Sequence, residues 1–365
     1  MKSISILLPD LRGGGAEHVN LDLAYEFKRL GCEVEFVLKQ ARGELLEEAR
    51  AGFSIVDLDT PRVRALPLPL IRYLRQARPD ALLAAMWPLT TIAAVTARMA
   101  GRGIRVLVSE HGVLSSQYSG HGRMHRAAMR LSTALGYRLA SARIGVSHGV
   151  AQDMRRLAFL REGEVQFIHN PVRDRGCDSI TDTVPAESFW GKRKGKRIVT
   201  VGRLKAVKNH ALLLRGFARL LESTPATLML VGAGELEEHL RHLANDLGVA
   251  EQVVFAGFHD DPAPFYASAD LFVLTSDREG FGNVIVEAMA QGTPVVCTDC
   301  PFGPAEILEG GRFGRLVPVG DEVALAEAMG DVLVNPPDSA NLRRRAAEFA
   351  PDIAARKYLE LLFPT

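Results

Sequence analysis

Short apolar runs alternate with longer stretches of helical periodicity along most of the chain. In the first half this pattern predicts strands at Ser3–Leu8, Glu33–Leu38, Ala81–Met86, Arg105–Ser109 and Ala142–Val146, and helices at Ala16–Leu30 and Leu89–Ala100. Strands that are apolar on both faces need helices on both sides of their sheet. The alternation is typical of βαβ units, so we expect a doubly wound α/β domain with a parallel sheet.

The alternation pauses between Pro171 and Arg197 and then restarts. The pause is rich in Asp, Ser, Thr and Gly and ends in a basic run, which is typical of a linker. After it the pattern predicts strands at Ile198–Val201, Thr227–Val231, Val253–Ala256, Leu271–Leu274 and Pro294–Cys297, and helices at Asn209–Leu221, Leu236–Leu247 and Asn283–Gln291. A last amphipathic helix, from about Ala340 to Leu362, is broken at Pro351. The sequence therefore predicts two similar α/β halves.

The composition fits this picture and excludes several classes of protein. The 365 residues are 47% hydrophobic and 24% charged, which is ordinary for a globular chain with room for two domains. A formal net charge of +1 argues against a globally basic nucleic-acid binder, and four cysteines suit a reducing cytoplasm better than a disulfide scaffold. The longest uncharged run contains Trp87-Pro88 and three threonines, so we interpret it as strand, turn and helix. We find no signal peptide and expect a cytoplasmic protein.

Glycines and cations follow two of the predicted strands. Gly13, Gly14 and Gly15 come after the first strand and open a helix, where backbone amides can approach a phosphate. A dinucleotide fingerprint would have a third glycine where His18 stands, which disfavours NAD, and a plain tight turn is the alternative. Arg203 and Lys208 follow strand Ile198–Val201 without a P-loop. Two cations at the mouth of a parallel sheet suit a diphosphate, and two solvated loop cations are the alternative.

The strongest local signal is the segment 277–288. Glu279 lies in the loop before a predicted helix that begins near Asn283, and Glu287 lies two turns into that helix. The two carboxylates therefore frame a helix N-terminus, whose amides can hold a phosphate or a sugar hydroxyl. Glu287 stands among apolar residues and needs a partner, for which ribose hydroxyls are suitable. His111 follows strand Arg105–Ser109 on the ligand side of its sheet, and a structural histidine is the alternative.

Together these segments resemble the family-4 retaining glycosyltransferases, over nearly the whole chain. The most specific part is the pair Glu279 and Glu287 with seven residues between them, and the segments 14–17, 110–112, 168–172 and 201–208 add to it. The resemblance implies the GT-B fold, with two facing Rossmann-like domains and a cleft between them. The acceptor-binding domain would comprise residues 1–172 and the C-terminal helix at about 350–365. The nucleotide-sugar-binding domain would comprise residues 190–345.

The resemblance also implies roles for individual residues. Arg203 and Lys208 would hold the donor diphosphate, Glu279 would contact the donor sugar, and Glu287 the ribose. His111 would lie beside the reacting sugar. This gives His111, Glu279, Arg203 and Lys208 as catalytic residues, and further substrate-binding residues at Gly14, Gly15, Phe281, Gly282 and Asn283. No cofactor is expected, because a nucleotide diphosphate sugar, with UDP favoured, is the co-substrate.

Three features fall outside this pattern. Where many family members have Gly-Gly-x-x-Glu, residues 299–306 read Asp-Cys-Pro-Phe-Gly-Pro-Ala-Glu, which resembles a subgroup active on bacterial surface glycans. Cys297 and Cys300 have the spacing of a redox or zinc half-site, but no second cysteine pair accompanies them. Asp57 and Asp59 form a lone D-x-D, which we interpret as a strand end, and we predict no metal.

Charge is distributed unevenly along the chain. Residues 1–190 carry a net +5 and residues 191–365 a net −4, and the segment 61–150 has 13 arginines against Asp80 and Glu110. A basic surface with apolar neighbours suits an anionic membrane, and solvated helix faces are the alternative. We expect a hexosyl or N-acetylhexosaminyl transferase, retaining and metal-independent, that uses a lipid-linked or surface-glycan acceptor at the inner face of the cell membrane. A non-catalytic nucleotide-sugar-binding protein and a nucleotide-sugar epimerase remain alternatives, and no nucleic acid partner is expected.

Overall fold

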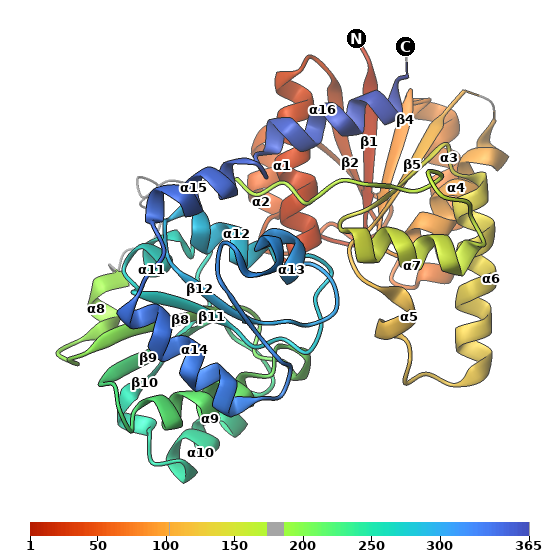
Figure 1. Cartoon of the computed structure of the whole chain (residues 1–365). Coiled ribbons are helices and arrows are strands. Elements are labelled where there is room, and N and C mark those ends of the chain that lie inside the picture. Colours follow the sequence, from red (N-terminus) through yellow and green to blue (C-terminus); the bar gives the residue numbers. More distant parts are fainter. Residues whose placement is uncertain (102, 174–185, 365) are drawn as a thin grey trace. The chain divides into compact units, whose positions relative to one another are not determined.

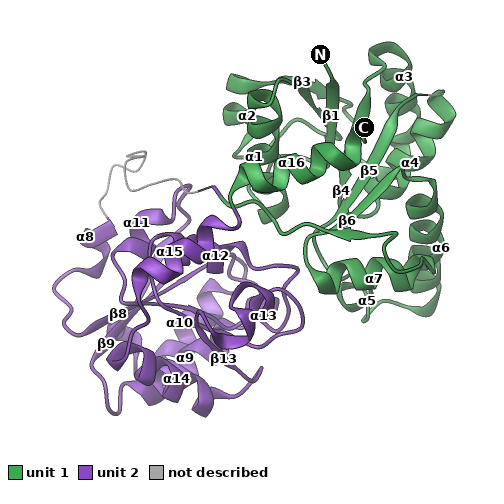
Figure 2. Ribbon diagram, turned by 45° about the horizontal axis from the view of Figure 1, so that its top comes forward, with its two compact units in different colours: residues 1–172, 350–365 green, residues 173–349 purple. Residues whose placement is uncertain are grey.

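The computed structural model of the chain describes residues 1–101, 103–173 and 186–364. It divides the chain into two compact units, coloured separately in Figure 2. Unit 1 comprises residues 1–172 and 350–365, and unit 2 comprises residues 173–349. The chain therefore leaves unit 1, forms unit 2 and returns to unit 1 with its last helix.

Unit 1 is built on a parallel sheet with the strand order β3-β2-β1-β4-β5-β6-β7 in its described part. The strands are β1 (Ser3–Leu8), β2 (Glu33–Leu38), β3 (Ser54–Asp57), β4 (Ala81–Ala85), β5 (Arg105–Glu110), β6 (Ala142–Gly145) and β7 (Gln166–Phe167). The order reverses at β1, which pairs with both β2 and β4. Such a switch point opens a crevice at the carboxyl ends of the strands, where ligands of α/β proteins bind.

Helices cover both faces of this sheet, as Figure 1 shows. They are α1 (Gly15–Arg29), α2 (Leu46–Gly52), α3 (Pro67–Ala77), α4 (Leu89–Ala100), α5 (Leu114–Gln117), α6 (Arg123–Leu139), α7 (His148–Ala158) and α16 (Pro351–Leu362). The C-terminal helix α16 packs against α1 and β5 and buries Ala355, Tyr358 and Leu362 in the same apolar cluster as Ile6 of β1. The last helix therefore completes the core of unit 1.

Unit 2 repeats the plan with the strand order β10-β9-β8-β11-β12-β13. The strands are β8 (Lys196–Val201), β9 (Ala226–Val231), β10 (Val253–Gly257), β11 (Leu271–Leu274), β12 (Val295–Thr298) and β13 (Arg315–Val317). The helices are α8 (Ala186–Trp190), α9 (His210–Leu220), α10 (Glu237–Asp246), α11 (Ala263–Ala267), α12 (Asn283–Ala290), α13 (Pro304–Ile307), α14 (Glu322–Val334) and α15 (Ser339–Ala347). The switch point here lies between β8 and β11, which pair directly.

Glycines let the loops at this switch point lie against one another. A Cβ on Gly232, just after β9, would stand 2.1 Å from the carbonyl oxygen of Gly202, just after β8. A Cβ on Gly234 would stand 2.3 Å from the carbonyl oxygen of Leu204. No side chain fits at either distance, so only glycine permits this approach. The loop that carries the two predicted cations is thus held against its neighbour by backbone contact.

The predicted fold class is confirmed: both halves are α/β units with parallel sheets. The linker prediction was wrong in its last part, because α8 lies within it and β8 begins at Lys196. Trp190 of α8 is only 1% exposed and donates its indole N–H to Ser268 at 2.9 Å, so this segment belongs to the core of unit 2. The middle of the predicted linker, residues 174–185, lies outside the described residues. None of the described helices combines the length and hydropathy that a membrane crossing requires.

A charge placed beneath α16 should unfold unit 1. Ala355 is fully buried and Arg356 beside it is exposed. We expect Ala355→Asp to lower the free energy of unfolding by about 3 kcal/mol or more, because an unpaired charge would be buried. Urea unfolding followed by Trp87 fluorescence in a Trp190→Phe background reports on unit 1 alone, since the chain has two tryptophans. Arg356→Asp is the matched control, and equal unfolding curves would contradict the docking of α16.

Candidate functional site

The loop between β11 and α12 is fixed at its centre by packing. Phe281 is buried and its ring lies 5.5 Å from that of Phe349, edge to face. Gly282, the residue before α12, has a φ of 104°, which favours glycine. A Cβ on Gly303 would stand 2.0 Å from the carbonyl oxygen of Phe281, so the loop after β12 presses on this one. The start of α12 at Asn283 is therefore held in place from both sides.

The two segments that the sequence singles out in this half meet in a short ion pair. The Lys208 ammonium donates to Glu279 Oε1 at 2.6 Å, and the Ser276 hydroxyl donates to the same oxygen at 2.6 Å. The two charged side chains are 16% and 13% exposed, so the pair is largely shielded from water. These bonds fix the position of the Lys208 ammonium group. Both of them use Oε1 of Glu279, and neither uses Oε2.

Uncharged hydrogen bonds hold the same two loops together. The Thr275 hydroxyl donates to the Lys208 carbonyl at 3.1 Å, and the Asp277 amide donates to the Val207 carbonyl at 2.9 Å. Asn209 donates through Nδ2 to Asp277 at 2.7 Å, and its side chain caps α9 by accepting the Leu212 amide. The position of Lys208 therefore does not depend on its ion pair alone. Ser276 and Asn209 are site residues that no sequence pattern indicated.

The loop after β8 concentrates positive charge. Burial lowers the pKa of Lys205, and the nearby charges of Lys208 and Arg203 lower it further. Burial also lowers the pKa of His210 to about 4, with Lys208 as the second cause. Arg203 is exposed beside this cluster. Three cations in one loop repel one another, so an anion bound here would be stabilised by all of them. Lys205 lies between the two predicted cations in the sequence and could have been included with them.

Glu287 has a protein partner that the sequence did not reveal. The buried Tyr266 hydroxyl, on α11, donates to Glu287 Oε2 at 2.9 Å. Burial and then the Glu287 charge raise the pKa of Tyr266, so the phenol stays protonated and acts as a donor. Glu287 therefore has the partner that its apolar surroundings require, and the contact with ribose stays a prediction. Tyr266 is 21 residues away in the sequence, and no local pattern connects the two.

In unit 1 the predicted residues lie at the carboxyl ends of β1 and β5. Gly14 precedes α1 in an extended conformation without a side-chain cap, and Gly15 is the first residue of the helix. His111 follows β5, and Ser109 Oγ lies 3.4 Å from its Nε2 atom. Burial lowers the pKa of His111 to about 4, so the ring is neutral at physiological pH. These three residues therefore share one edge of the sheet in unit 1.

Glu110, next to His111, is a buried anchor. Its carboxylate accepts the Trp87 backbone amide at 3.0 Å and the Thr90 and Tyr137 hydroxyls at 2.8 and 2.9 Å. Burial raises the pKa of Glu110 to about 7 against the opposite effect of these bonds. The carboxylate ties the end of β5 to α4 and α6. Glu110 belongs to the segment 110–112 that carries the family resemblance, and no sequence pattern indicates its structural role.

The remaining candidate residues are the Asp57–Asp59 pair and two cysteines, and their surroundings indicate a structural role. Asp57 ends β3 and accepts the Asp59 backbone amide at 2.8 Å, which agrees with its interpretation as a strand end. Cys297 of β12 and Cys300 are buried free thiols. Burial raises the pKa of Cys300 to about 12 and also raises that of Cys297, so both stay protonated. Protonated thiols are weak nucleophiles, so these two cysteines have the character of structural buried thiols.

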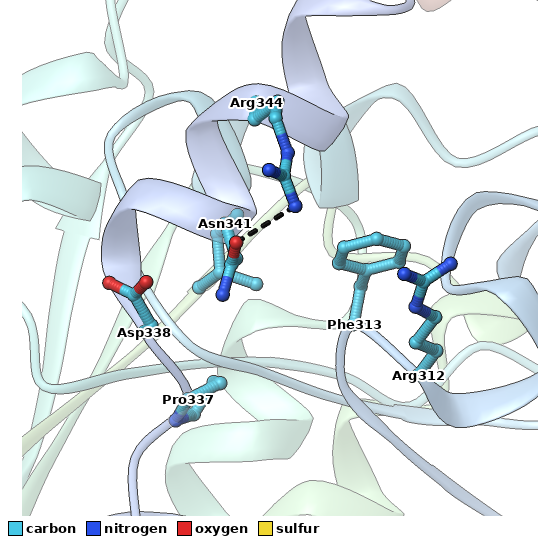
Figure 3. A pocket seen from close by; sticks show the side chains of 7 residues that line it. Arg312, Phe313, Pro337, Asp338, Asn341 and Arg344 are labelled. Atoms are coloured by element: carbon cyan, nitrogen blue, oxygen red, sulfur yellow. Dashed lines mark hydrogen bonds between the residues drawn. The ribbon is translucent and has the colours of Figure 1, made fainter.

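A hollow of about 140 Å³ lies elsewhere in unit 2, beside the start of α15 (Figure 3). Arg344 crosses its rim and donates to Asn341 at 2.9 Å, and Arg312 pairs with Glu309 at 3.0 Å. None of the residues that line it is a predicted site residue. Its arginines already have protein partners, so we assign no chemistry to it.

Comparisons with known proteins agree with this arrangement. The model for Glycosyltransferase Family 4 matches residues 13–175, and the model for Glycosyl transferases group 1 matches residues 195–335. The lipopolysaccharide core biosynthesis glycosyltransferase LpsE of Rhizobium meliloti is 29% identical over 365 residues, which cover 96% of each chain. The predicted family resemblance is therefore confirmed.

Two further similarities concern part of the chain and the fold. The N-acetylgalactosamine-N,N'-diacetylbacillosaminyl-diphospho-undecaprenol 4-alpha-N-acetylgalactosaminyltransferase of Campylobacter jejuni is 29% identical over 242 residues. That match covers 66% of this chain and 63% of the Campylobacter protein, less than two thirds of its length. The crystal structure of Anabaena HepE with UDP-glucose superposes with a TM-score of 0.82, at 22% identity and 99% coverage of both chains. This likeness confirms the GT-B fold class.

Glu110 should make stability depend on pH. The pKa of Glu110 is about 7 in the folded protein, against an ordinary 4.5. Between pH 4.5 and pH 7, the folded protein therefore keeps a proton on Glu110 that the unfolded chain has released. Stability from this group is therefore present below pH 4.5 and is lost as pH rises through 7, by about 3 kcal/mol in all. Urea unfolding at pH 5 and pH 8 should show this loss in the wild type and not in Glu110→Gln.

The control is Glu162→Gln, which removes an acid whose side chain is 92% exposed. It should keep the pH dependence of the wild type. Equal pH dependence in wild type and Glu110→Gln would show that the Glu110 carboxylate does not bind its proton more tightly in the folded protein.

Proposed function

We propose that this chain, whose two halves match the models for Glycosyltransferase Family 4 and Glycosyl transferases group 1, transfers a hexosyl or N-acetylhexosaminyl group from a nucleotide diphosphate sugar to a hydroxyl group. The acceptor is a lipid-linked or surface glycan. Both units match glycosyltransferase models, and LpsE, which aligns with nearly the whole chain, is a lipopolysaccharide core glycosyltransferase. A UDP-sugar is the favoured donor, since the Anabaena protein of the same fold was crystallised with UDP-glucose.

One observation carries the proposal: Lys208, paired with Glu279, lies in the loop after β8 together with two further cations, Arg203 and Lys205. Cleavage of the bond between the sugar and the diphosphate leaves negative charge on the departing phosphate oxygen. A preorganised ammonium group and a guanidinium group next to that oxygen lower the barrier. Lys208 is already held by Glu279 and Ser276, so it needs little reorganisation during the reaction. Arg203, which is exposed, would close onto the diphosphate when the donor binds.

The other predicted residues of unit 2 would contact the ribose and the sugar of the donor. Glu287 keeps one oxygen on Tyr266, which fixes the orientation of the carboxylate. Its other oxygen would accept a ribose hydroxyl. Glu279 would contact the sugar, and the backbone amides at Gly282 and Asn283 begin α12, where partial positive charge favours an anion or a hydroxyl. Phe281 contributes by packing, because its ring is buried.

We propose retention of configuration and no requirement for a divalent metal. In the step, the bond from the anomeric carbon to the phosphate oxygen breaks and a bond to the acceptor oxygen forms on the same face. The acceptor proton passes to the departing phosphate, which becomes the leaving diphosphate. Arg203 and Lys208 supply the positive charge that a metal would otherwise provide. His111 is neutral, so it adds no charge beside the sugar.

The acceptor side of the proposal is supported by helix α6. Met124 and Leu131 of α6 are 88% and 75% exposed, and Leu135 and Leu139 continue the same stripe at helical spacing. Met129, Thr133 and Tyr137 on the opposite face are buried against unit 1. Exposed arginines flank the stripe at Arg123, Arg126 and Arg130. An apolar stripe flanked by arginines suits an anionic bilayer, where a lipid-linked acceptor would be presented.

Removing the loop cations should lower turnover far more than it lowers stability. We expect Lys208→Ala and Arg203→Ala each to lower kcat about 100-fold or more, the usual cost of one charge-stabilising group, ~3–4 kcal/mol. Release of UDP from a panel of UDP-sugars, with and without lipid extract as acceptor, measures the rate. Lys192→Ala, which replaces an exposed lysine of the same unit, is the control.

EDTA should leave the wild-type rate unchanged.

Retained turnover in either variant would remove that residue from the leaving-group role. A rate that EDTA abolishes and manganese restores would overturn metal independence. Wild-type protein that neither binds nor cleaves any UDP- or GDP-sugar would refute the transferase proposal itself.

Membrane binding should depend on the exposed stripe of α6. Flotation with liposomes should increase with the fraction of anionic lipid and decrease with salt, because each basic residue near such a surface contributes about 1 kcal/mol within a Debye length. Leu131→Ser with Leu135→Ser should reduce flotation, as should Arg123→Ser with Arg126→Ser. Val334→Ser removes a comparably exposed apolar residue from unit 2 and should have no effect. Equal flotation with neutral liposomes would contradict the proposed surface.

A further inference from the structure

His111 lies at the end of a short chain of hydrogen bonds that starts on the C-terminal helix. The Tyr358 hydroxyl of α16 lies 3.2 Å from Ser109 Oγ, and Ser109 Oγ lies 3.4 Å from His111 Nε2. Tyr358 is 249 residues from Ser109 in the sequence, and both belong to unit 1. Tyr358 and Ser109 are each 1% exposed. The contact is therefore part of the core and is not an incidental surface bond.

The direction of these bonds follows from the number of protons available. Among the described residues, Ser109 is the hydrogen-bond partner of the Tyr358 hydroxyl, so the phenol proton must go to Ser109 Oγ to avoid being buried without an acceptor. Burial raises the pKa of Tyr358 to about 12, which keeps that proton in place. Ser109 then has its own proton to donate, and His111 Nε2 is within reach. If Ser109 Oγ instead accepted from both groups, its own proton would be buried without an acceptor among the described residues, so the ring nitrogen accepts it.

A neutral ring that accepts at Nε2 carries its proton on Nδ1. The Nδ1 atom of His111 is buried and has no hydrogen-bond partner among the described residues. A buried donor without a partner costs about 1–3 kcal/mol, and native structures seldom leave one without a reason. A bound ligand oxygen is the partner that this edge of the sheet can offer, because His111 stands at the carboxyl end of β5.

We propose that Tyr358 and Ser109 are positioning residues that hold His111 as its Nδ1–H tautomer, so that the ring donates a hydrogen bond to a hydroxyl oxygen of the bound sugar. The sugar ligand rests on the proposed function, whereas the tautomer does not. The proposal also gives α16 a part in the site: the helix that completes the core of unit 1 sets the proton on a ring in the substrate region.

The tautomer can be read directly from the full-length protein. Nitrogen NMR of protein labelled with ¹⁵N-histidine, at neutral pH and without ligand, distinguishes a protonated from an unprotonated ring nitrogen, and His111→Gln identifies the signal. We expect wild-type His111 to carry its proton on Nδ1. Ser109→Ala removes the donor to Nε2 and should give a mixture of tautomers or the Nε2–H form. Tyr73→Phe removes another buried hydroxyl of unit 1 and should leave the signal unchanged.

Kinetics provide the second measurement. Tyr358→Phe and Ser109→Ala should lower kcat about three- to tenfold, the range of one ordinary hydrogen bond, with a smaller change in KM for the sugar donor. Ser109→Thr restores a hydroxyl and should recover most of the loss. A purely structural role would lower the unfolding midpoint and leave the kcat of the folded fraction unchanged.

The outcomes separate this proposal from the proposed function. Wild-type His111 with its proton on Nε2, or an unchanged Nδ1–H signal in Ser109→Ala, would overturn the positioning role whatever the enzyme does. An Nδ1–H signal that responds to Ser109→Ala supports it even if no nucleotide sugar is cleaved, in which case the transferase proposal alone fails. Should Ser109→Ala not fold, Tyr358→Phe removes the proton that Ser109 Oγ accepts, which leaves Ser109 able to accept from Nε2–H; we expect a shift from Nδ1–H toward a mixture of tautomers, and an unchanged signal would overturn the positioning role of Tyr358.

Discussion

The site of unit 2 depends on one ion pair, between Lys208 and Glu279. The two residues are 71 positions apart in the sequence and meet because β8 and β11 are neighbours in the sheet, so their carboxyl ends open onto the same edge. With side chains 16% and 13% exposed, neither charge is well solvated once its partner is removed. Asn209 and Thr275 brace the same two loops with neutral bonds. The ammonium group is therefore fixed before any ligand arrives, as electrostatic stabilisation requires.

In unit 1 the end of β5 is fixed in a comparable way, because consecutive residues of this strand contact helices on opposite faces of the sheet. Successive side chains point to opposite faces of a sheet. Ser109 meets Tyr358 of α16 on one side, while Glu110 accepts hydroxyl groups from α4 and α6 on the other. His111 follows directly. Helices on both faces thus hold the last two residues of β5, and the segment that carries His111 inherits their rigidity. The amphipathic helix α6 is anchored to this same strand through Tyr137.

Local pattern explains which parts of this arrangement the sequence revealed. The strongly apolar strands and the helix starting at Asn283 were predicted to within one or two residues, whereas β3 was missed because its residues are half-buried or exposed. The predicted residues Glu279 and Lys208 do meet, and their roles toward a ligand remain predictions. Tyr266 and Tyr358 could not be found, because their contacts with Glu287 and Ser109 exist only after distant segments have packed. The linker prediction failed at Trp190 because the contact that buries it, with Ser268, is equally remote.

The net charge of the second half differs from the charge around its site. Residues 191–365 carry a net −4, yet the loop after β8 gathers Arg203, Lys205 and Lys208. Salt screens charges over about 8–10 Å under physiological conditions. A small anion at that loop therefore interacts with these three cations and only weakly with the more distant charges of the chain. A membrane is different, because an extended plane interacts with every charge that lies near it. Net charge over a long segment therefore bears on the surface around α6, whereas only the immediate neighbours of Lys208 bear on a diphosphate.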